Sequence, residues 1–132
     1  MTWHPTVQDV LTAHEVVKEN SRVRTSGFRQ SQEKGLRKIR EVLESARGED
    51  DIYRAAAIYL KKLIEKHPFN DGNKRTAFLI ANRFLSENGK GFAPRKIQED
   101  EEIYQVLKWE LKSTDVETLA SWLETGELPD DR

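Results

Sequence analysis

The sequence predicts an all-α protein, a compact single-domain bundle of about six helices around one central helix. Strand signals are weak, whereas apolar residues recur at helical spacing almost throughout the 132 residues. Capping residues, prolines and glycines divide this pattern into segments of ordinary helix length. The chain has no internal repeat and no low-complexity segment, and its length suits one hydrophobic core. We therefore expect residues 1–132 to form a single domain.

The first two helices are each marked by a capping residue before an apolar stripe. Thr6 and Asp9 have the spacing of a capping box, and the stripe behind them continues to Val17. A polar connector follows. Ser31 is expected to cap a second helix that ends near Gly48.

The third helix and the central helix are separated by a short polar stretch. Asp50 or Asp51 is expected to cap the third helix. This helix should stop at His67, because Pro68 disfavours helical geometry in the residue before it. A new helix is expected over residues 73–89, and it is apolar around most of its circumference, as a central helix usually is. Its apolar residues are Phe78, Leu79, Ile80, Ala81, Phe84 and Leu85.

Two shorter helices are expected in the last third of the chain. Ile103, Val106 and Leu107 have helical spacing and indicate the fifth helix. Thr114, with Glu117 three residues later, is expected to cap the sixth.

Composition and charge exclude several classes of function. Lys and Arg total 22 against 23 Asp and Glu, so no overall basic charge indicates direct binding of nucleic acid. The absence of cysteine excludes disulfides, thiolate zinc sites and a cysteine nucleophile. The N-terminal residues do not resemble a signal peptide, and no apolar run approaches the ~20 residues that span a bilayer. We expect a cytoplasmic protein without a membrane segment.

The stretch "HPFNDGNKRTAF", residues 67–78, crowds polar groups against the start of the central helix. A glycine-containing turn that enters a helix exposes backbone N–H groups at the positive end of the helix dipole, which is a site for anions such as phosphate. The exposed N–H groups here would belong to Asn73, Lys74 and Arg75. Two cations in a first turn oppose the dipole unless an anion compensates them.

The side chains of this stretch suit phosphate chemistry. Arg75 is able to bind phosphate oxygens bidentately, and Lys74 adds a mobile charge. Asp71 is placed to share Mg²⁺ with bound phosphates, and His67 is a candidate general base. Phe69 is expected to plug the core and anchor the loop. Each residue alone has an ordinary explanation as a cap, a turn or a solvated face, but their ordered combination indicates a phosphoryl or nucleotidyl transferase.

This stretch closely resembles the signature of the Fic/Doc family, His-Pro-Phe-x-Asp/Glu-Gly-Asn-Gly/Lys-Arg. The matching residues are His67, Pro68, Phe69, Asp71, Gly72, Asn73, Lys74 and Arg75. The segments "VLESA", "RFLSENG" and "LASWLE" resemble the death-on-curing (Doc) branch, so the likeness covers roughly residues 5–125. Doc-branch proteins are compact helical toxins of about this length, which agrees with the fold predicted above.

The resemblance implies a role for each matching residue. His67 would be the base that activates a target hydroxyl, and Asp71 would bind the Mg²⁺ that bridges the nucleotide phosphates. Gly72, Asn73, Lys74 and Arg75 would form the phosphate-binding segment. Lys74 matches the Doc branch, whose members transfer the γ-phosphate of ATP to translation elongation factor Tu and arrest growth.

Two alternatives stay open. Fic-type members have Gly at the position of Lys74 and transfer AMP, and Pro68 and Gly72 are nearer to that adenylylating pattern than to Doc itself. The other alternative is a non-catalytic module that keeps the fold and the anion site to bind a partner.

The resemblance also bears on how the target protein is bound and on how the activity is inhibited. The flap that pairs with the target in this family is expected within residues 47–53, which is a short segment. Neither Glu19-Asn20 nor Glu87-Asn88 completes the Ser/Thr-x-x-x-Glu-Gly/Asn motif of a built-in inhibitory helix. We therefore expect an antitoxin that acts in trans, with a disordered segment that folds onto the toxin.

A zinc enzyme is not indicated. "HEVVK", which begins at His14, lacks the second histidine of His-Glu-x-x-His, because Lys18 stands in its place. His14 is expected to pack on the inner face of its helix.

Overall fold

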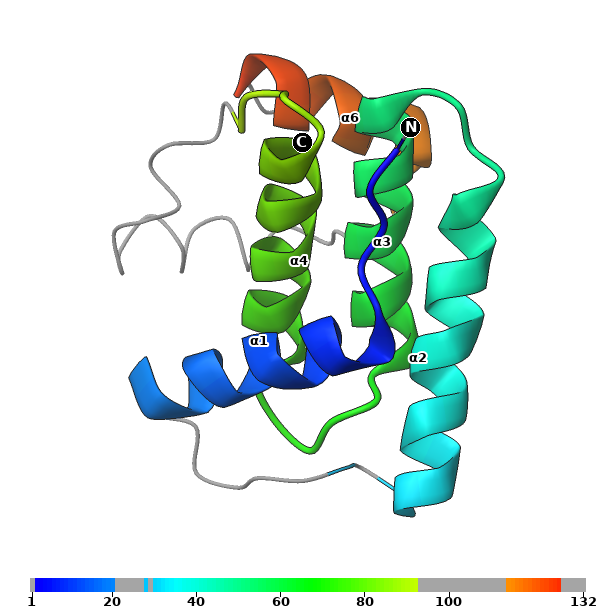
Figure 1. Cartoon of the computed structure of the whole chain (residues 1–132), viewed down its shortest axis with the longest axis vertical. Coiled ribbons are helices and arrows are strands. Elements are labelled where there is room, and N and C mark those ends of the chain that lie inside the picture. Colours follow the sequence, from blue (N-terminus) through cyan, green and yellow to red (C-terminus); the bar gives the residue numbers. More distant parts are fainter. Residues whose placement is uncertain (1, 21–27, 29, 93–113, 127–132) are drawn as a thin grey trace.

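The computed structural model describes residues 2–20, 28, 30–92 and 114–126, and within them the protein is all-helical (Figure 1). The helices are α1 (Val7–Asn20), α2 (Gln32–Arg47), α3 (Ile52–Lys66), α4 (Asn73–Glu87) and α6 (Val116–Thr125). The predicted all-α class is confirmed. The helix expected around residues 103–107 lies outside the described residues.

Three of the helices stand side by side, and the other two cross their ends. Figure 1 shows α2, α3 and α4 roughly parallel or antiparallel to one another, with α1 across one end and α6 at the other. α3 packs against α2, α4 and α6, while α1 packs mainly against α4. α3 and α4 therefore form the centre of the bundle, and the loop that joins them lies at the end crossed by α1.

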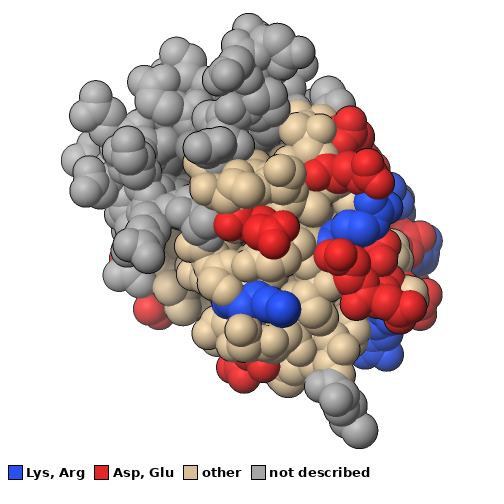
Figure 2. All heavy atoms as spheres, turned by 90° about the horizontal axis from the view of Figure 1, so that it is seen from above, with Lys and Arg blue, Asp and Glu red and all other residues tan. Residues whose placement is uncertain are grey.

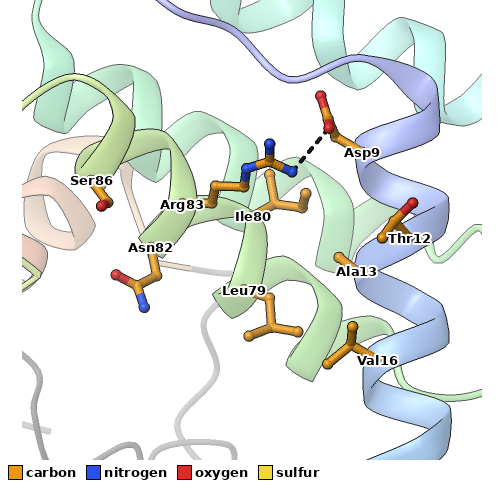
Figure 3. Close-up of a pocket in the computed structure, with 9 residues that line it drawn as sticks. All are labelled: Asp9, Thr12, Ala13, Val16, Leu79, Ile80, Asn82, Arg83 and Ser86. Atoms are coloured by element: carbon orange, nitrogen blue, oxygen red, sulfur yellow. Dashed lines mark hydrogen bonds and ion pairs between the residues drawn. The ribbon is translucent and has the colours of Figure 1, made fainter.

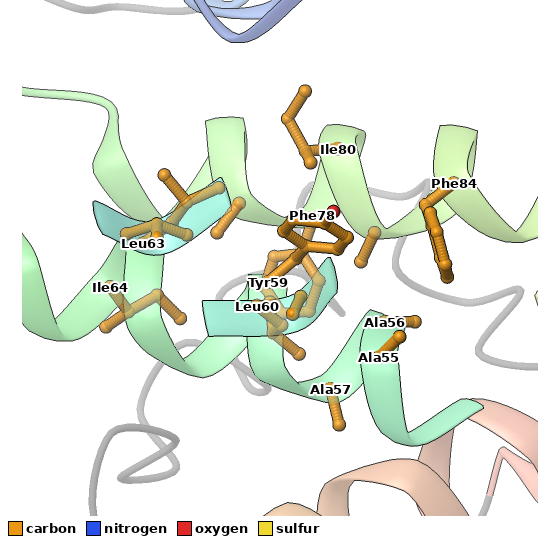
Figure 4. Packing of buried hydrophobic residues seen from close by; sticks show 14 of the residues in the cluster. Ala55, Ala56, Ala57, Tyr59, Leu60, Leu63, Ile64, Phe78, Ile80 and Phe84 are labelled. Atoms are coloured by element: carbon orange, nitrogen blue, oxygen red, sulfur yellow. The ribbon is translucent and has the colours of Figure 1, made fainter. Parts of the chain in front are cut away.

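The core lies mainly between α3 and α4 and extends to α6 (Figure 4). The ring of Tyr59 on α3 meets the ring of Phe84 on α4 edge to face, with centroids 5.2 Å apart. Phe78 meets Trp122 of α6 in the same manner at 5.8 Å. Such offset aromatic pairs add stability beyond their burial, so they fasten α4 to α3 and to α6.

Local capping agrees with the sequence prediction at three helices and corrects it at one. Thr6 and Asp9 form the reciprocal capping box, with N-to-oxygen distances of 2.7 and 3.2 Å. Ser31 and Asp51 cap α2 and α3 through their side-chain oxygens. The cap of α6 is Asp115 and not the expected Thr114, because the Asp115 carboxylate accepts the N–H of Thr118 at 2.7 Å.

The segment expected to contain the flap lies far from the signature loop. Residues 47–53 include the turn between α2 and α3, residues 48–51, which Figure 1 places at the opposite end of the bundle from the α3–α4 loop. α3 has 15 residues, and at 1.5 Å per residue it separates the two ends by about 22 Å. Phe28 lies beside the α3–α4 loop, where it forms an antiparallel bridge with Phe69.

Charges of both signs lie next to each other on the end of the molecule seen in Figure 2. Arg54, near the start of α3, pairs with Glu49 at 3.1 Å and with Glu117 of α6 at 2.7 Å. The mixture of charges on this face agrees with the balanced composition. In the same part of the chain, no helix has the length and apolar character that crossing a membrane requires.

The fold changes the surroundings of His4, near the N-terminus. Its Nδ1 is hydrogen-bonded to the Tyr59 hydroxyl at 2.6 Å, and its ring lies 5.3 Å from that of Phe84. Burial, and then the positive charge of Arg47, lower the pKa of His4 below 6.5. Burial also raises the pKa of Tyr59 to about 12, so the phenol keeps its proton at neutral pH.

His4 is therefore expected to make the free energy of unfolding depend on pH. The unfolded chain binds a proton at His4 near pH ~6.5, whereas the folded chain resists protonation until the pH is lower. The stabilisation is complete above pH ~6.5 and is lost as the pH falls toward the folded-state pKa. Urea unfolding at about pH 7.5 and pH 5.5 measures the effect. His4→Gln should lose less stability on acidification than the wild type, and equal losses would contradict the prediction.

Candidate functional site

The candidate site is the loop that joins α3 to α4, together with the first turn of α4. His67 ends α3 in a left-handed conformation, with φ 52° and ψ 57°, while its N–H donates to the Leu63 carbonyl at 3.2 Å. Among the described residues it is the only non-glycine with positive φ. Such a conformation persists only where its surroundings enforce it, and it is commoner at functional sites than elsewhere. The helix thus stops where Pro68 predicts, and His67 lies half-buried at its end.

Phe69 is buried and stacked with two other rings. Its side chain is 2% exposed. The ring of His14 lies 3.8 Å away and within 5° of parallel, and that of Phe28 lies 5.6 Å away at 18°. Gly35 of α2 makes room for this packing, because a Cβ at that position would overlap the Phe28 ring. The loop is thereby attached to α1 and to the segment before α2.

Asn73, at the first position of α4, closes the loop through its side chain. Its Oδ1 accepts the N–H of Phe69 at 3.0 Å, and its Nδ2 donates to the Phe69 carbonyl at 2.9 Å. The residue is 5% exposed. The side-chain amide is thus engaged with the loop through both its oxygen and its nitrogen, and the backbone N–H of Asn73 lies at the helix end where a phosphate would bind.

Gly72 and Asp71 form the turn into α4. Gly72 has φ 82°, in the left-handed region that favours glycine, and as N-cap it provides no side-chain cap. The first N–H that bonds back to this cap is that of Thr76, at 3.0 Å from the Gly72 carbonyl. Asp71 is exposed, and its Oδ1 accepts the Gly72 N–H at 2.8 Å.

The first turn of α4 is unusual in its charge. It contains Lys74 and Arg75 but no acidic residue. Lys74 is exposed and Arg75 is partly exposed. Cations at the positive end of a helix dipole are unfavourable unless an anion is nearby, so this turn is suited to bind one.

The donor set fits a magnesium ion that is shared with a nucleotide and does not fit a site built from protein ligands alone. Within the described ranges, no three His, Cys, Asp or Glu residues converge as a metal cage would require. Mg²⁺ is commonly held by one or two carboxylates together with phosphate oxygens and water. Asp71 supplies one exposed carboxylate beside the cationic first turn.

A separate groove of about 370 Å³ lies between α1 and α4 (Figure 3). Asp9 and Arg83 form an ion pair of 2.9 Å along it, and Val16 and Leu79 line it with side chains that are 42% and 37% exposed. None of the residues expected to act on phosphate lines this groove. Along α4 the groove begins at Leu79, one helical turn after Arg75.

Two residues that contact the loop were not assigned to it from the sequence. His14 contacts Phe69 and Asp71 although 55 and 57 positions separate them along the chain. The only sequence signal was its place on the apolar stripe of the first helix. Phe28, in a polar connector, gave no periodic signal at all.

Comparison with known protein families gives one result. The family model described as the Fic/DOC family matches residues 5–85, which include α1, α2, α3, the loop and most of α4. No curated protein and no solved structure matches the chain. The family match supports a Fic-type function, the modification of proteins with groups derived from nucleotides. It spans more than half of the sequence, and the chain therefore belongs to the Fic/DOC family.

Proposed function

We propose that the protein is a Doc-like toxin that transfers the γ-phosphate of ATP to a hydroxyl group of a target protein. The observation that carries this proposal is the first turn of α4, where Lys74 and Arg75 stand at the positive helix end without an acidic residue. His67 and Asp71 lie on the adjoining loop. Translation elongation factor Tu is the target that the Doc resemblance suggests, with arrest of growth in the cytoplasm as the outcome.

Each residue of the site has a role in this reaction. The N-terminal N–H groups of α4 and the Arg75 guanidinium would bind phosphate oxygens, and Lys74 would offset further negative charge. Asp71 would hold Mg²⁺, which supplies neutralisation of charge on the phosphates. His67 would accept the proton of the target hydroxyl as that oxygen forms a bond to Pγ. The bond from Pγ to the bridging oxygen breaks, and ADP leaves.

Adenylylation is the second candidate, favoured by Pro68 and Gly72. In that reaction the target oxygen attacks Pα, and pyrophosphate leaves in place of ADP. Gly72 has the left-handed φ of 82°. Doc itself has alanine at this position, and alanine adopts this conformation less readily than glycine. The third candidate, a binding module without catalysis, would keep the fold and the anion site but would not need His67 as a base.

Restraint in trans is part of the proposal. Glu87 is the last residue of α4, far from the signature loop, and Glu19 is the second-last residue of α1. Neither belongs to the motif of an inhibitory helix. An antitoxin is therefore proposed as the partner that silences the site.

The fate of labelled ATP tests which group is transferred. Extracts incubated with the protein should show one protein band labelled from γ-labelled ATP and none from α-labelled ATP. Lys74→Ala should lower the transfer by roughly 10- to 100-fold, the scale of a lost hydrogen bond to a charged group. Lys62→Ala is the matched control, because Lys62 forms an ion pair with Glu65 on the surface of α3, at 3.3 Å, and is not part of the signature.

Two outcomes would contradict the proposal. Label from α-labelled ATP would assign the protein to the adenylylating class. Absence of label from both forms, with growth arrest still present, would leave the binding module.

A further inference from the structure

His14 reaches the signature loop from a helix that contains no residue of the signature. It lies in the middle of α1 and is 4% exposed. Its Nε2 is 2.9 Å from the main-chain oxygen of Asp71, and its ring is stacked 3.8 Å from that of Phe69. One side chain thus contacts both the buried anchor and the exposed acid of the loop.

The direction of this hydrogen bond follows from the acceptor. A main-chain carbonyl oxygen has no proton to give, so Nε2 of His14 must carry the hydrogen and donate it. The ring therefore acts as a fixed N–H donor whose orientation is set by its stacking on Phe69.

Hydrogen bonds consequently hold the main chain of the loop at two points, Phe69 and Asp71. Asn73 holds the N–H and the carbonyl of Phe69, and His14 holds the carbonyl of Asp71. The carboxylate of Asp71 is tied to the next peptide by the N–H of Gly72 at 2.8 Å. Rotation of the peptide between Asp71 and Gly72 would move that carboxylate, and the bond from His14 opposes this rotation.

We propose that His14 is a positioning residue, which orients the Asp71 carboxylate by donating its Nε2–H to the Asp71 carbonyl. This inference rests on the proposed function, since a fixed carboxylate matters because Asp71 is assigned to Mg²⁺. It differs from a role in packing alone, which would need only the ring of His14 against Phe69.

Two substitutions separate the donor from the ring. His14→Gln places an amide N–H donor near the position of Nε2 but removes the aromatic ring. His14→Phe keeps a ring against Phe69 but removes the donor. Hydrogen exchange of amides in residues 67–75, measured by mass spectrometry, reports opening of the loop without any need for activity. Initial rates of label transfer then report the consequence for the reaction.

The expected result is that both measurements follow the donor. Exchange in residues 67–75 should be roughly tenfold faster in His14→Phe than in the wild type, the scale on which one hydrogen bond changes an equilibrium. His14→Gln should restore slower exchange, and kcat/KM for ATP should fall in His14→Phe and recover in His14→Gln. Exchange in His14→Phe equal to that of the wild type, or a glutamine variant no better than the phenylalanine variant in either measurement, would overturn the proposal.

A measurement on the unaltered protein keeps the test independent of folding in the variants. The ring nitrogen-15 shifts of histidine-labelled wild-type protein identify which nitrogen of His14 carries the proton. Protonated Nε2 is required, and a ring protonated only at Nδ1 would overturn the proposal. If the wild type transfers no label at all, the proposed function fails, whereas the exchange and nitrogen shifts still decide whether His14 holds the loop.

Discussion

Replacement of His67 by alanine is expected to lower the rate of label transfer by about 10²–10⁴-fold and to abolish growth arrest. In the proposed reaction, the target hydroxyl must lose its proton as it attacks phosphorus, and His67 is the base at the loop. Loss of the imidazole leaves the phosphate-binding turn of α4 intact. ATP binding should therefore change far less than the rate of transfer.

Growth after induction and label transfer in extracts check this prediction side by side. The folded state should tolerate the change, because His67 is half-buried at the end of α3 and is not part of the hydrophobic core. His4→Gln is the matched control, since His4 contacts Tyr59 and Phe84 and is absent from the loop. Undiminished arrest by His67→Ala would reject both enzymatic candidates and favour the binding module.

Replacement of Asn73 by alanine is expected to destabilise the protein by about 2–4 kcal/mol and to disable the site as well. The substitution leaves the N–H and the carbonyl of Phe69 without their side-chain partners. Both groups are in buried hydrogen bonds, and a buried polar group that loses its partner costs about 1–3 kcal/mol. The expected loss is a large part of the roughly 5–15 kcal/mol that stabilises a typical domain.

Urea unfolding measures the loss, and hydrogen exchange in residues 67–75 locates it. Asn82→Ala is the matched control, because it makes the same chemical change on the partly exposed side of the same helix. It should change the free energy of unfolding by no more than about 0.5 kcal/mol. If Asn73→Ala lowers the free energy of unfolding by no more than this control does, the two hydrogen bonds of Asn73 do not hold the loop.

His67→Ala and Asn73→Ala are expected to differ in their effect on stability, because His67 acts in the reaction and Asn73 holds the loop. His67→Ala should impair the reaction in a stable protein, whereas Asn73→Ala should impair both stability and reaction. Asn73, which is expected in the phosphate-binding segment, also closes the loop with its side chain. Its contribution to an anion would come from its backbone N–H.

The helices and the place of the signature loop were determined by the sequence itself. Caps such as Ser31 and Asp51, and the restriction that Pro68 places on His67, act over a few residues and can be recognised locally. Choices between adjacent residues were less certain: Asp115 caps α6 in place of Thr114, since both residue types are able to cap a helix.

Only the tertiary structure decided which distant segments meet the loop. The turn at residues 48–51 precedes α3 and lies a full helix length from His67, whereas Phe28 lies beside Phe69, at the end of the bundle that α1 crosses. The contact of His14 with Asp71 depends on the same crossing of α1 over α4. Local patterns do not specify how helices cross, because crossing is set by side chains that interlock across the core. The sequence therefore indicated the chemistry of the loop, and the packing of α1 determined what holds it in place.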